Sequence, residues 1–333
     1  MLRLPPFDYF APRTVAEAVS LLAERGSEAM IVAGGTDLYP NMKRRQFEPK
    51  TLVGLRGIAE LKRMEGDAER GLTIGAGVTL TQVSRHPMIT EKYPALAHAA
   101  GVVSTAQLRN MGTIGGNLCV DTRCNYYNQS YHWRKSIGFC MKKDGDICLV
   151  APGSSRCWAV SSSDTAPVMI ALGASVRLVG PKGERVIPAQ ALYHDDGMEY
   201  LTKAPNEILT EIILPPAEGL RTAYLKLRRR GSFDFPILGV AVALRLDDGV
   251  CTYAKIVLGA VHSYPVEALQ ALSRLVGQKL TPDVIEAAAQ AAARPAKPLD
   301  NTDMLLSYRK KMVPVYVARA LRQAAGLQAV NEY

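Results

Sequence analysis

The cysteines of this chain are concentrated in one segment. Of the six cysteines in 333 residues, five lie between Cys119 and Cys157, together with several Tyr, Trp, Lys and Arg residues. The segment shows no sustained helix or strand pattern over about 40 residues, and an irregular stretch of that length inside a compact domain is usually functional or disordered. Any fold assigned to the chain must therefore accommodate a cysteine-rich insertion. Its cysteines and bulky aromatic residues favour a functional segment over a disordered one.

The spacing of these cysteines limits the kind of site they can form. No two are separated by only two residues, which disfavours a zinc ribbon or finger, and the order does not match the compact ferredoxin patterns. In a cytoplasmic chain, such a group more often indicates a metal site than a disulfide framework. Widely spaced thiolates suit an iron–sulfur cluster wrapped by an irregular loop, and the basic residues of the segment would balance its negative charge. The spacings are Cys119-x4-Cys124-x15-Cys140-x7-Cys148-x8-Cys157.

Five candidates for four ligand positions leave one cysteine to exclude. Cys119 stands in the apolar run Leu118-Cys119-Val120, directly after a glycine turn, which is a setting typical of a core residue. The sixth cysteine, Cys251, lies in a strand-like run and is interpreted as a small core residue. Unrelated buried thiols and a zinc site remain the alternatives to a cluster.

The rest of the chain divides into three predicted parts. Residues 1–56 alternate helix and strand, beginning with a capping box at Thr14–Glu17, and form a small α/β lobe. Residues 57–180 resume this alternation and contain the insertion at about 120–160. Residues 181–333 form a C-terminal α+β domain with an antiparallel sheet and helices. Its predicted strands are 208–214, 223–228, 237–246 and 251–260, and its predicted helices are 266–276, 281–293 and 303–325.

Composition and charge exclude several classes of protein. Hydrophobic residues make up 48% and charged residues 21%, which are ordinary globular values. No apolar run approaches the roughly 18 to 20 residues of a membrane helix, and the first ten residues lack the apolar core of a signal peptide. We therefore expect a soluble, cytoplasmic protein that does not bind membranes. The net charge of +9 comes from short basic runs without interleaved aromatics, so we expect no nucleic-acid binding.

Two glycine-rich turns indicate an anionic cofactor. Gly34-Gly35-Thr36-Asp37 follows an apolar strand, and Thr113-Ile-Gly-Gly-Asn117 is a second such turn. Glycine lets backbone amides approach a ligand closely, and a helix terminus after the turn favours phosphate. Neither turn is the G-x-G-x-x-G fingerprint of NAD-binding domains, and no Walker lysine is present. The alternative is that both are ordinary tight turns, but the presence of two such turns in a basic chain favours a dinucleotide cofactor.

These motifs resemble the FAD-binding medium subunit of the molybdenum hydroxylases, the family of xanthine dehydrogenase, CO dehydrogenase and aldehyde oxidoreductase. The matching segments, which run through most of the chain, are Ala33–Asp37, Leu108–Asn117, Asp164–Pro167, Ala171–Ala174, Lys226, Arg230 and Asp234–Pro236. Within the family, the insertion is similar to that of the β subunit of 4-hydroxybenzoyl-CoA reductase. This second likeness is carried by Asn117–Cys119, Thr122–Cys124, Tyr127–Ser130, Cys140, Cys148 and Cys157.

The resemblance implies a fold and a set of binding residues. The fold is α+β, with a two-lobed FAD-binding domain of the vanillyl-alcohol-oxidase/CO dehydrogenase flavoprotein type and a C-terminal antiparallel sheet with helices. The residues implied to hold the FAD pyrophosphate are Ile31, Val32, Ala33, Gly34, Gly35, Thr36, Asp37 and Leu38. Those implied to lie beside the pyrophosphate and the flavin are Thr113, Ile114, Gly115, Gly116 and Asn117. Two further residues, Asp164 and Lys226, are implied to contact the cofactor. The implied ligands of a [4Fe–4S] cluster are Cys124, Cys140, Cys148 and Cys157.

The resemblance also implies partners and a role. The chain would pass electrons between the cluster, FAD and two further subunits, a molybdopterin-binding large subunit and a [2Fe–2S] small subunit, in a dimer of heterotrimers. In the reductase, ferredoxin or a similar carrier supplies the electrons that remove an aromatic hydroxyl group. Because the substrate would bind to the molybdopterin subunit, we expect no catalytic residue in this chain. The alternatives are an aldehyde or purine oxidoreductase subunit, a freestanding flavoprotein reductase, and a zinc-stabilised scaffold.

Overall fold

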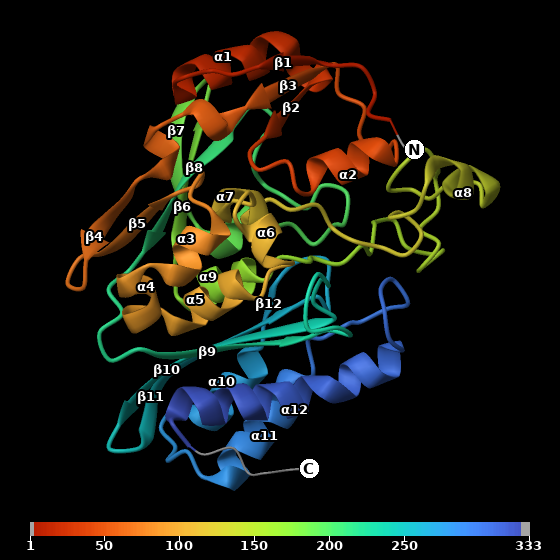
Figure 1. Cartoon of the computed structure of the whole chain (residues 1–333). Helices are drawn as coiled ribbons and strands as arrows, with labels where there is room; N and C mark the ends of the chain where they lie inside the picture. The colour runs from red at the N-terminus through yellow and green to blue at the C-terminus, as the bar shows by residue number, and fades with distance from the viewer. Residues whose placement is uncertain (1–2, 328–333) are drawn as a thin grey trace.

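The computed structural model describes residues 3–327, which form three lobes stacked along the molecule (Figure 1). The N-terminal lobe is a parallel three-stranded sheet of order β1-β3-β2. Helix α1 begins where the Thr14 hydroxyl accepts the Glu17 amide, and it ends at Gly26, whose φ is +53°. Its buried face, which includes Leu22, packs toward the sheet. The elements are β1 (Asp8–Phe10), α1 (Val15–Arg25), β2 (Ala29–Val32), α2 (Leu38–Lys43) and β3 (Thr51–Gly54).

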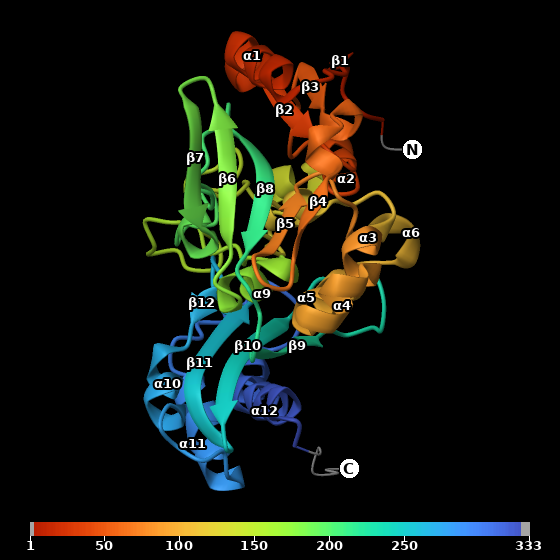
Figure 2. The same ribbon diagram turned by 90° about the vertical axis from the view of Figure 1, so that its left-hand side faces the viewer.

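The second lobe is an antiparallel five-stranded sheet of order β4-β5-β8-β6-β7, with short helices beside it (Figures 1 and 2). Its strands are β4 (Met64–Asp67), β5 (Gly71–Gly75), β6 (Ser175–Gly180), β7 (Gly183–Pro188) and β8 (Ile208–Leu214). Its helices are α3 (Leu80–Arg85), α4 (Pro87–Lys92), α5 (Pro94–Gly101), α6 (Ala106–Arg109), α7 (Ile114–Leu118) and α9 (Thr165–Ala171). All seven residues of α9 are buried, because the helix lies between this lobe and the next sheet.

The third lobe is an antiparallel sheet of order β12-β11-β10-β9, covered by three helices. Its elements are β9 (Arg221–Leu227), β10 (Leu238–Asp247), β11 (Val250–Gly259), β12 (Val266–Glu267), α10 (Leu269–Leu275), α11 (Pro282–Ala292) and α12 (Leu306–Ala325). The predicted fold class is confirmed: an α+β, FAD-domain-like pair of lobes precedes a C-terminal antiparallel sheet with helices. Within residues 3–327, no helix is long and apolar enough to cross a bilayer.

The strand at 208–214 does not belong to the C-terminal meander that the sequence predicts. It is β8, which pairs with β5 and β6 at the centre of the second sheet. Strands β6 and β7 form a hairpin in that sheet, and the predicted domain boundary at residues 180/181 falls between these two paired strands. Alternating apolar residues mark a strand but not its neighbours, because pairing depends on residues far away in the chain. We propose residues 215–220 as the division instead.

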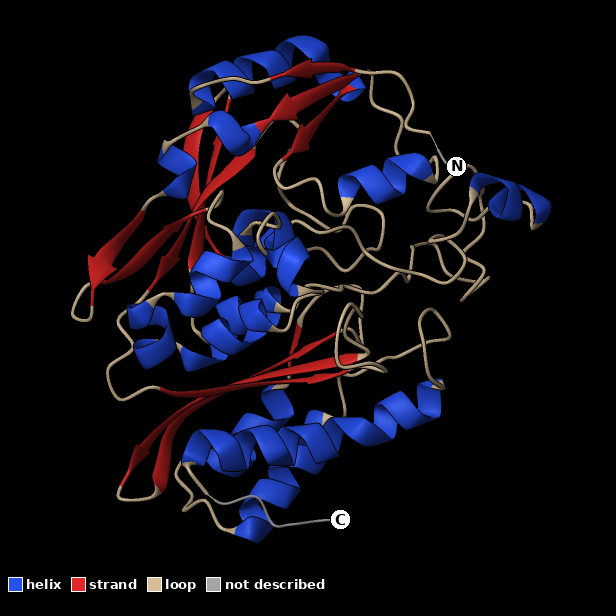
Figure 3. Cartoon of the chain, in the orientation of Figure 1, coloured by secondary structure: helices blue, strands red, loops and turns tan. Residues whose placement is uncertain are grey.

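The cysteine-rich insertion joins α7 to α9 and is drawn mostly as loop (Figure 3). Its one helix, α8 (Tyr131–Ser136), begins where the Ser130 hydroxyl accepts the Trp133 amide. The insertion lies at the side of the molecule next to α2 (Figure 1). It therefore contacts the lobe that carries the first glycine turn, although it is inserted in the second.

Candidate functional site

The two glycine turns meet. A Cβ atom added to Gly34 would overlap the Met111 carbonyl group, lying 2.6 Å from its carbon and 3.0 Å from the Gly112 Cα atom. Only glycine allows this approach. Gly35, at φ +70°, turns the chain into α2. The two motifs, which are far apart in the sequence and are each predicted to bind an anion, are thus in contact in the structure.

The first turn presents a row of backbone donors. Among residues 3–327, no acceptor receives the main-chain N–H groups of residues 34–37. These residues are only partly exposed. Successive free N–H groups in a turn form a concave site for an anion, so the turn fits the pyrophosphate of a dinucleotide. The predicted residues Ile31 and Val32 belong to β2, which leads into the turn, and Leu38 begins α2 after it.

The second turn is held in place by its own side chains. The Thr113 hydroxyl accepts the Gly116 amide at 3.1 Å and starts α7. Gly115 lies against Ala76, where an added Cβ would be 2.6 Å from the Ala76 Cβ atom, and the neighbouring Ile114 is fully buried. The Asn117 side-chain oxygen accepts hydrogen bonds from the side chains of two residues at the start of α9, Ser163 and Thr165. Asn117 thus ties the second turn to α9.

Asp164 and Lys226 form a buried ion pair between the second and third lobes. The Lys226 ammonium donates to one Asp164 oxygen at 2.8 Å, and the Tyr224 hydroxyl donates to the other at 2.8 Å. Both charged side chains are only 3% exposed. Burial raises the pKa of Asp164 and lowers that of Lys226, while the attraction between the two charges opposes both shifts. The predicted cofactor residues Asp164 and Lys226 therefore lie together, and they hold β9 against the start of α9.

Cys124, Cys140, Cys148 and Cys157 line one small pocket inside the insertion. All four are free thiols and are 4–7% exposed. Burial raises the pKa of Cys124 to about 12 and that of Cys157 to about 11. The Cys157 sulfur accepts the Ala159 amide at 3.4 Å. Cys119 does not line this pocket; it packs against the core of the second lobe.

The pocket also has a buried cation in its wall. The Lys142 ammonium donates to Asp121 Oδ1 at 2.8 Å and to the Gly197 carbonyl, and it lies 4.8 Å from the centre of the Tyr127 ring. Against the larger effect of burial, the Lys142 charge lowers the pKa of the Cys157 thiol, and the thiolate is the form that binds metal.

The donor set fits a polynuclear cluster. A single zinc ion would hold its thiolates at about 2.3 Å. Across residues 3–327, no three His, Cys, Asp or Glu side chains are grouped closely enough to hold one metal ion. Four thiols around one pocket, with backbone N–H groups directed at the Cys124 and Cys157 sulfurs, are the type of donor set that an iron–sulfur cluster requires.

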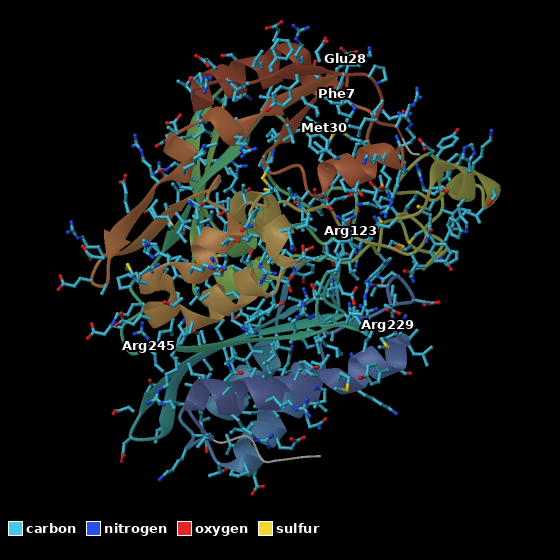
Figure 4. All side chains as sticks on the ribbon, viewed as in Figure 1. Phe7, Glu28, Met30, Arg123, Arg229 and Arg245 are labelled. Atoms are coloured by element: carbon cyan, nitrogen blue, oxygen red, sulfur yellow. The ribbon has the colours of Figure 1, made fainter. Side chains whose placement is uncertain are left out.

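Arg123, Tyr127 and Arg134 fasten the insertion to the first glycine turn and to the residues that follow α2. Arg123, which is labelled in Figure 4, pairs with Asp37 in the first glycine turn. Its guanidinium lies 4.5 Å from the centre of the Phe235 ring. Gln46 donates to the Tyr127 carbonyl at 2.6 Å. Arg134, fully buried, donates to the carbonyls of Arg44 and Arg45.

The sequence did not predict that these residues fasten the insertion to the N-terminal lobe. Arg123 has one local signal, since it precedes a candidate cysteine ligand. Gln46 has no signal, because its partner Tyr127 lies 81 residues further along the chain. Such contacts become visible only when the fold brings the segments together.

The fold and the glycine turns define a dinucleotide-binding flavoprotein with a third, α+β lobe. Residues 5–217 match the family described as FAD binding domain in molybdopterin dehydrogenase, and residues 222–324 match the CO dehydrogenase flavoprotein C-terminal domain. The chain belongs to this family of FAD-binding subunits of molybdenum hydroxylases. The predicted flavoprotein subunit of an oxidoreductase complex is confirmed, with FAD as its cofactor.

Individual relatives agree with this assignment. The carbon monoxide dehydrogenase medium chain of Hydrogenophaga pseudoflava is 32% identical over 96% of this chain and 97% of its own. The aldehyde oxidoreductase FAD-binding subunit PaoB of Escherichia coli (strain K12) is also 32% identical, over 96% of this chain and 99% of its own. A solved structure, the reconstituted CO dehydrogenase from Oligotropha carboxidovorans, has a chain that matches with a TM-score of 0.81 at 29% identity, covering 98% of this chain and 100% of that one.

Proposed function

We propose that the chain carries FAD and a [4Fe–4S] cluster and transfers electrons between them within a molybdenum-dependent complex. The observation that carries the proposal is the pocket lined by Cys124, Cys140, Cys148 and Cys157. The pocket belongs to an insertion that is fastened to the glycine turn of the FAD lobe. Bound FAD would exchange electrons in pairs or singly, and the cluster would exchange them one at a time.

The residues of this chain would hold the two cofactors and screen them from water. The N–H groups of residues 34–37, together with Thr113, Ile114, Gly115, Gly116 and Asn117, would bind the pyrophosphate and the adjoining flavin. Asp164 and Lys226 would close the third lobe against this site. In the insertion, Lys142 would stabilise negative charge on the thiolates, and the apolar walls of the pocket would exclude solvent.

The proposed partners are a molybdopterin-binding large subunit and a [2Fe–2S] small subunit, in a dimer of heterotrimers. The names of the relatives support a multi-subunit complex: the Hydrogenophaga protein is a medium chain, and the Escherichia coli protein is an FAD-binding subunit. Substrate chemistry would take place on the molybdopterin subunit. We further propose the cytoplasm as the location, because a group of metal-binding cysteines is typical of a reducing compartment.

Within the family, we propose a 4-hydroxybenzoyl-CoA reductase type of complex, which acts in aromatic degradation and takes electrons from ferredoxin or a similar carrier. The support is the cysteine insertion, whose four last thiols share one pocket. The second candidate is an aldehyde oxidoreductase subunit, which the 32% identity to PaoB favours. The two candidates differ in the substrate of the molybdopterin subunit.

The test is metal and flavin analysis of the anaerobically purified chain, freed from partners. We expect four irons, four sulfides and one FAD per chain, without zinc. Replacing Cys140→Ser should remove the cluster iron while FAD still binds at saturating concentration. The matched variant Cys119→Ser, outside the pocket, should keep its iron. Equal iron loss from both variants would contradict the choice of ligands, and FAD without iron in the unchanged chain would overturn the cluster.

A further inference from the structure

Helix α2 lies between the two proposed cofactor sites. The residues directly before it, 34–37, form the glycine turn whose free N–H groups are proposed to bind the pyrophosphate. The residues directly after it, Arg44, Arg45 and Gln46, contact the insertion. One short segment thus touches both sites through its two ends.

The contacts on the insertion side come from the wall of the cysteine pocket or from residues next to it. Tyr127, whose carbonyl accepts the Gln46 side chain, lines the pocket. Arg123, which pairs with Asp37 and also approaches Asn41 of α2 at 3.4 Å, is followed directly by Cys124. Any rearrangement of the pocket therefore moves the groups that hold α2.

The insertion has little regular structure of its own to keep these groups in place. Apart from α8, it consists of loops and turns, and its apolar cluster is small. Four ligand bonds to a cluster would fix the pocket far more strongly than these contacts do. The free energy of metal binding in such a site is also the free energy of ordering the loop.

We propose that the segment formed by the glycine turn, α2 and Gln46 couples the two cofactors, so that a filled cysteine pocket strengthens FAD binding. The coupling rests on the proposed function, since it requires the cluster. By thermodynamic reciprocity, bound FAD stabilises the cluster by the same factor. Couplings of this kind change affinity by about 5- to 150-fold. Gln46 and Arg123 are positioning residues in this scheme, and Gln46 reaches the cysteine pocket only through Tyr127.

The first test compares the FAD dissociation constant of the full-length chain with and without its cluster. The cluster is loaded anaerobically with iron and sulfide in one sample and omitted in the other. We expect FAD to bind at least about fivefold more tightly to the loaded chain. A chain that takes up iron but binds FAD equally well in both states overturns the coupling alone. A chain that takes up no iron overturns the proposed cluster as well, so the two failures are distinguishable.

The second test uses Gln46→Met, which removes the hydrogen bond to Tyr127 and keeps the volume of the buried side chain. The matched control is Lys43→Met, which introduces the same side chain at an exposed position of α2. We expect the ratio of the loaded and unloaded dissociation constants to fall toward one in Gln46→Met and to stay unchanged in Lys43→Met. A purely structural role for Gln46 would weaken FAD binding equally in both states and leave the ratio intact. That result would overturn the assignment of Gln46.

Discussion

Substituting Gly34→Ala tests whether the two glycine turns form one binding site. The new Cβ atom would lie 2.6 Å from the Met111 carbonyl carbon and would overlap its oxygen. Carbon atoms in ordinary contact are about 3.5–4.0 Å apart, so the turns must separate by about 1 Å. The overlapped atoms of Met111 and Gly112 are backbone atoms, and the Cβ atom of alanine is fixed by its own backbone, so no side-chain rotation can relieve the overlap.

The magnitude of the effect follows from the cost of overpacking. Forcing an extra methyl group into a well-packed site costs about 1–3 kcal/mol. We assume that the substitution separates the turns in the FAD-free chain and that FAD binding must bring them together again at this cost. Because about 1.4 kcal/mol corresponds to a factor of ten, the FAD dissociation constant then rises by about 5- to 150-fold. To the extent that the turns stay in contact without FAD, this cost lowers the stability of the FAD-free chain instead of weakening FAD binding.

The assay is titration of the FAD-free chain with FAD, accompanied by urea unfolding of the same samples. The control is Gly153→Ala, because Gly153 is exposed, has no atom within 4 Å of an added Cβ and does not have a positive φ. We expect the control to bind FAD as the unchanged chain does. If Gly34→Ala binds FAD within twofold of the control and is no less stable in urea, the contact between the turns has no part in the cofactor site.

Two further predictions concern buried charges. Lys226→Met should destabilise the chain by about 3–5 kcal/mol in urea unfolding, since it leaves the Asp164 carboxylate buried without its partner, and adding Asp164→Asn should restore part of the loss. His262 has its pKa lowered to about 4, first by burial and then by the nearby Arg156 charge. The unfolded chain takes up this proton near pH 6.5, whereas the folded chain takes it up only near pH 4, so the free energy of unfolding should fall as pH drops from 6.5 to 4. We expect a loss of about 2 kcal/mol, a value reduced for the opposing Asp195 charge and for solvent screening. His262→Gln should flatten this part of the pH profile, and an unchanged slope would assign it to other groups.

The sequence predicted the parts of the fold that depend on local signals. The cap at Thr14 and the glycine at position 26 delimit α1 as expected. The strand at 208–214 also appears, yet it pairs with β5 and β6 rather than with the C-terminal strands. A period of two residues identifies a strand in either sheet, and the choice depends on pairing with strands that are distant in the sequence.

At the candidate site, the sequence indicated which cysteines gather but overstated the positive charge available to them. The basic residues of the insertion were expected to balance an anionic cluster. In the structure, the charge of Arg123 is paired with Asp37, and Arg134 donates to the carbonyls after α2. Arg156 pairs with Asp195, so among the insertion's basic residues only Lys142 lines the pocket.

The two arginines therefore have a different role from the predicted one. Arg134 supplies a positive charge where α2 ends, which is a favourable position for it along the helix dipole. Arg123 holds the other end of the same helix through Asp37. Lys142 is itself paired with Asp121, so a pocket of four thiolates depends more on backbone N–H groups and on its own fixed geometry. That geometry depends on the contacts with α2, and for this reason cluster binding and FAD binding should influence each other.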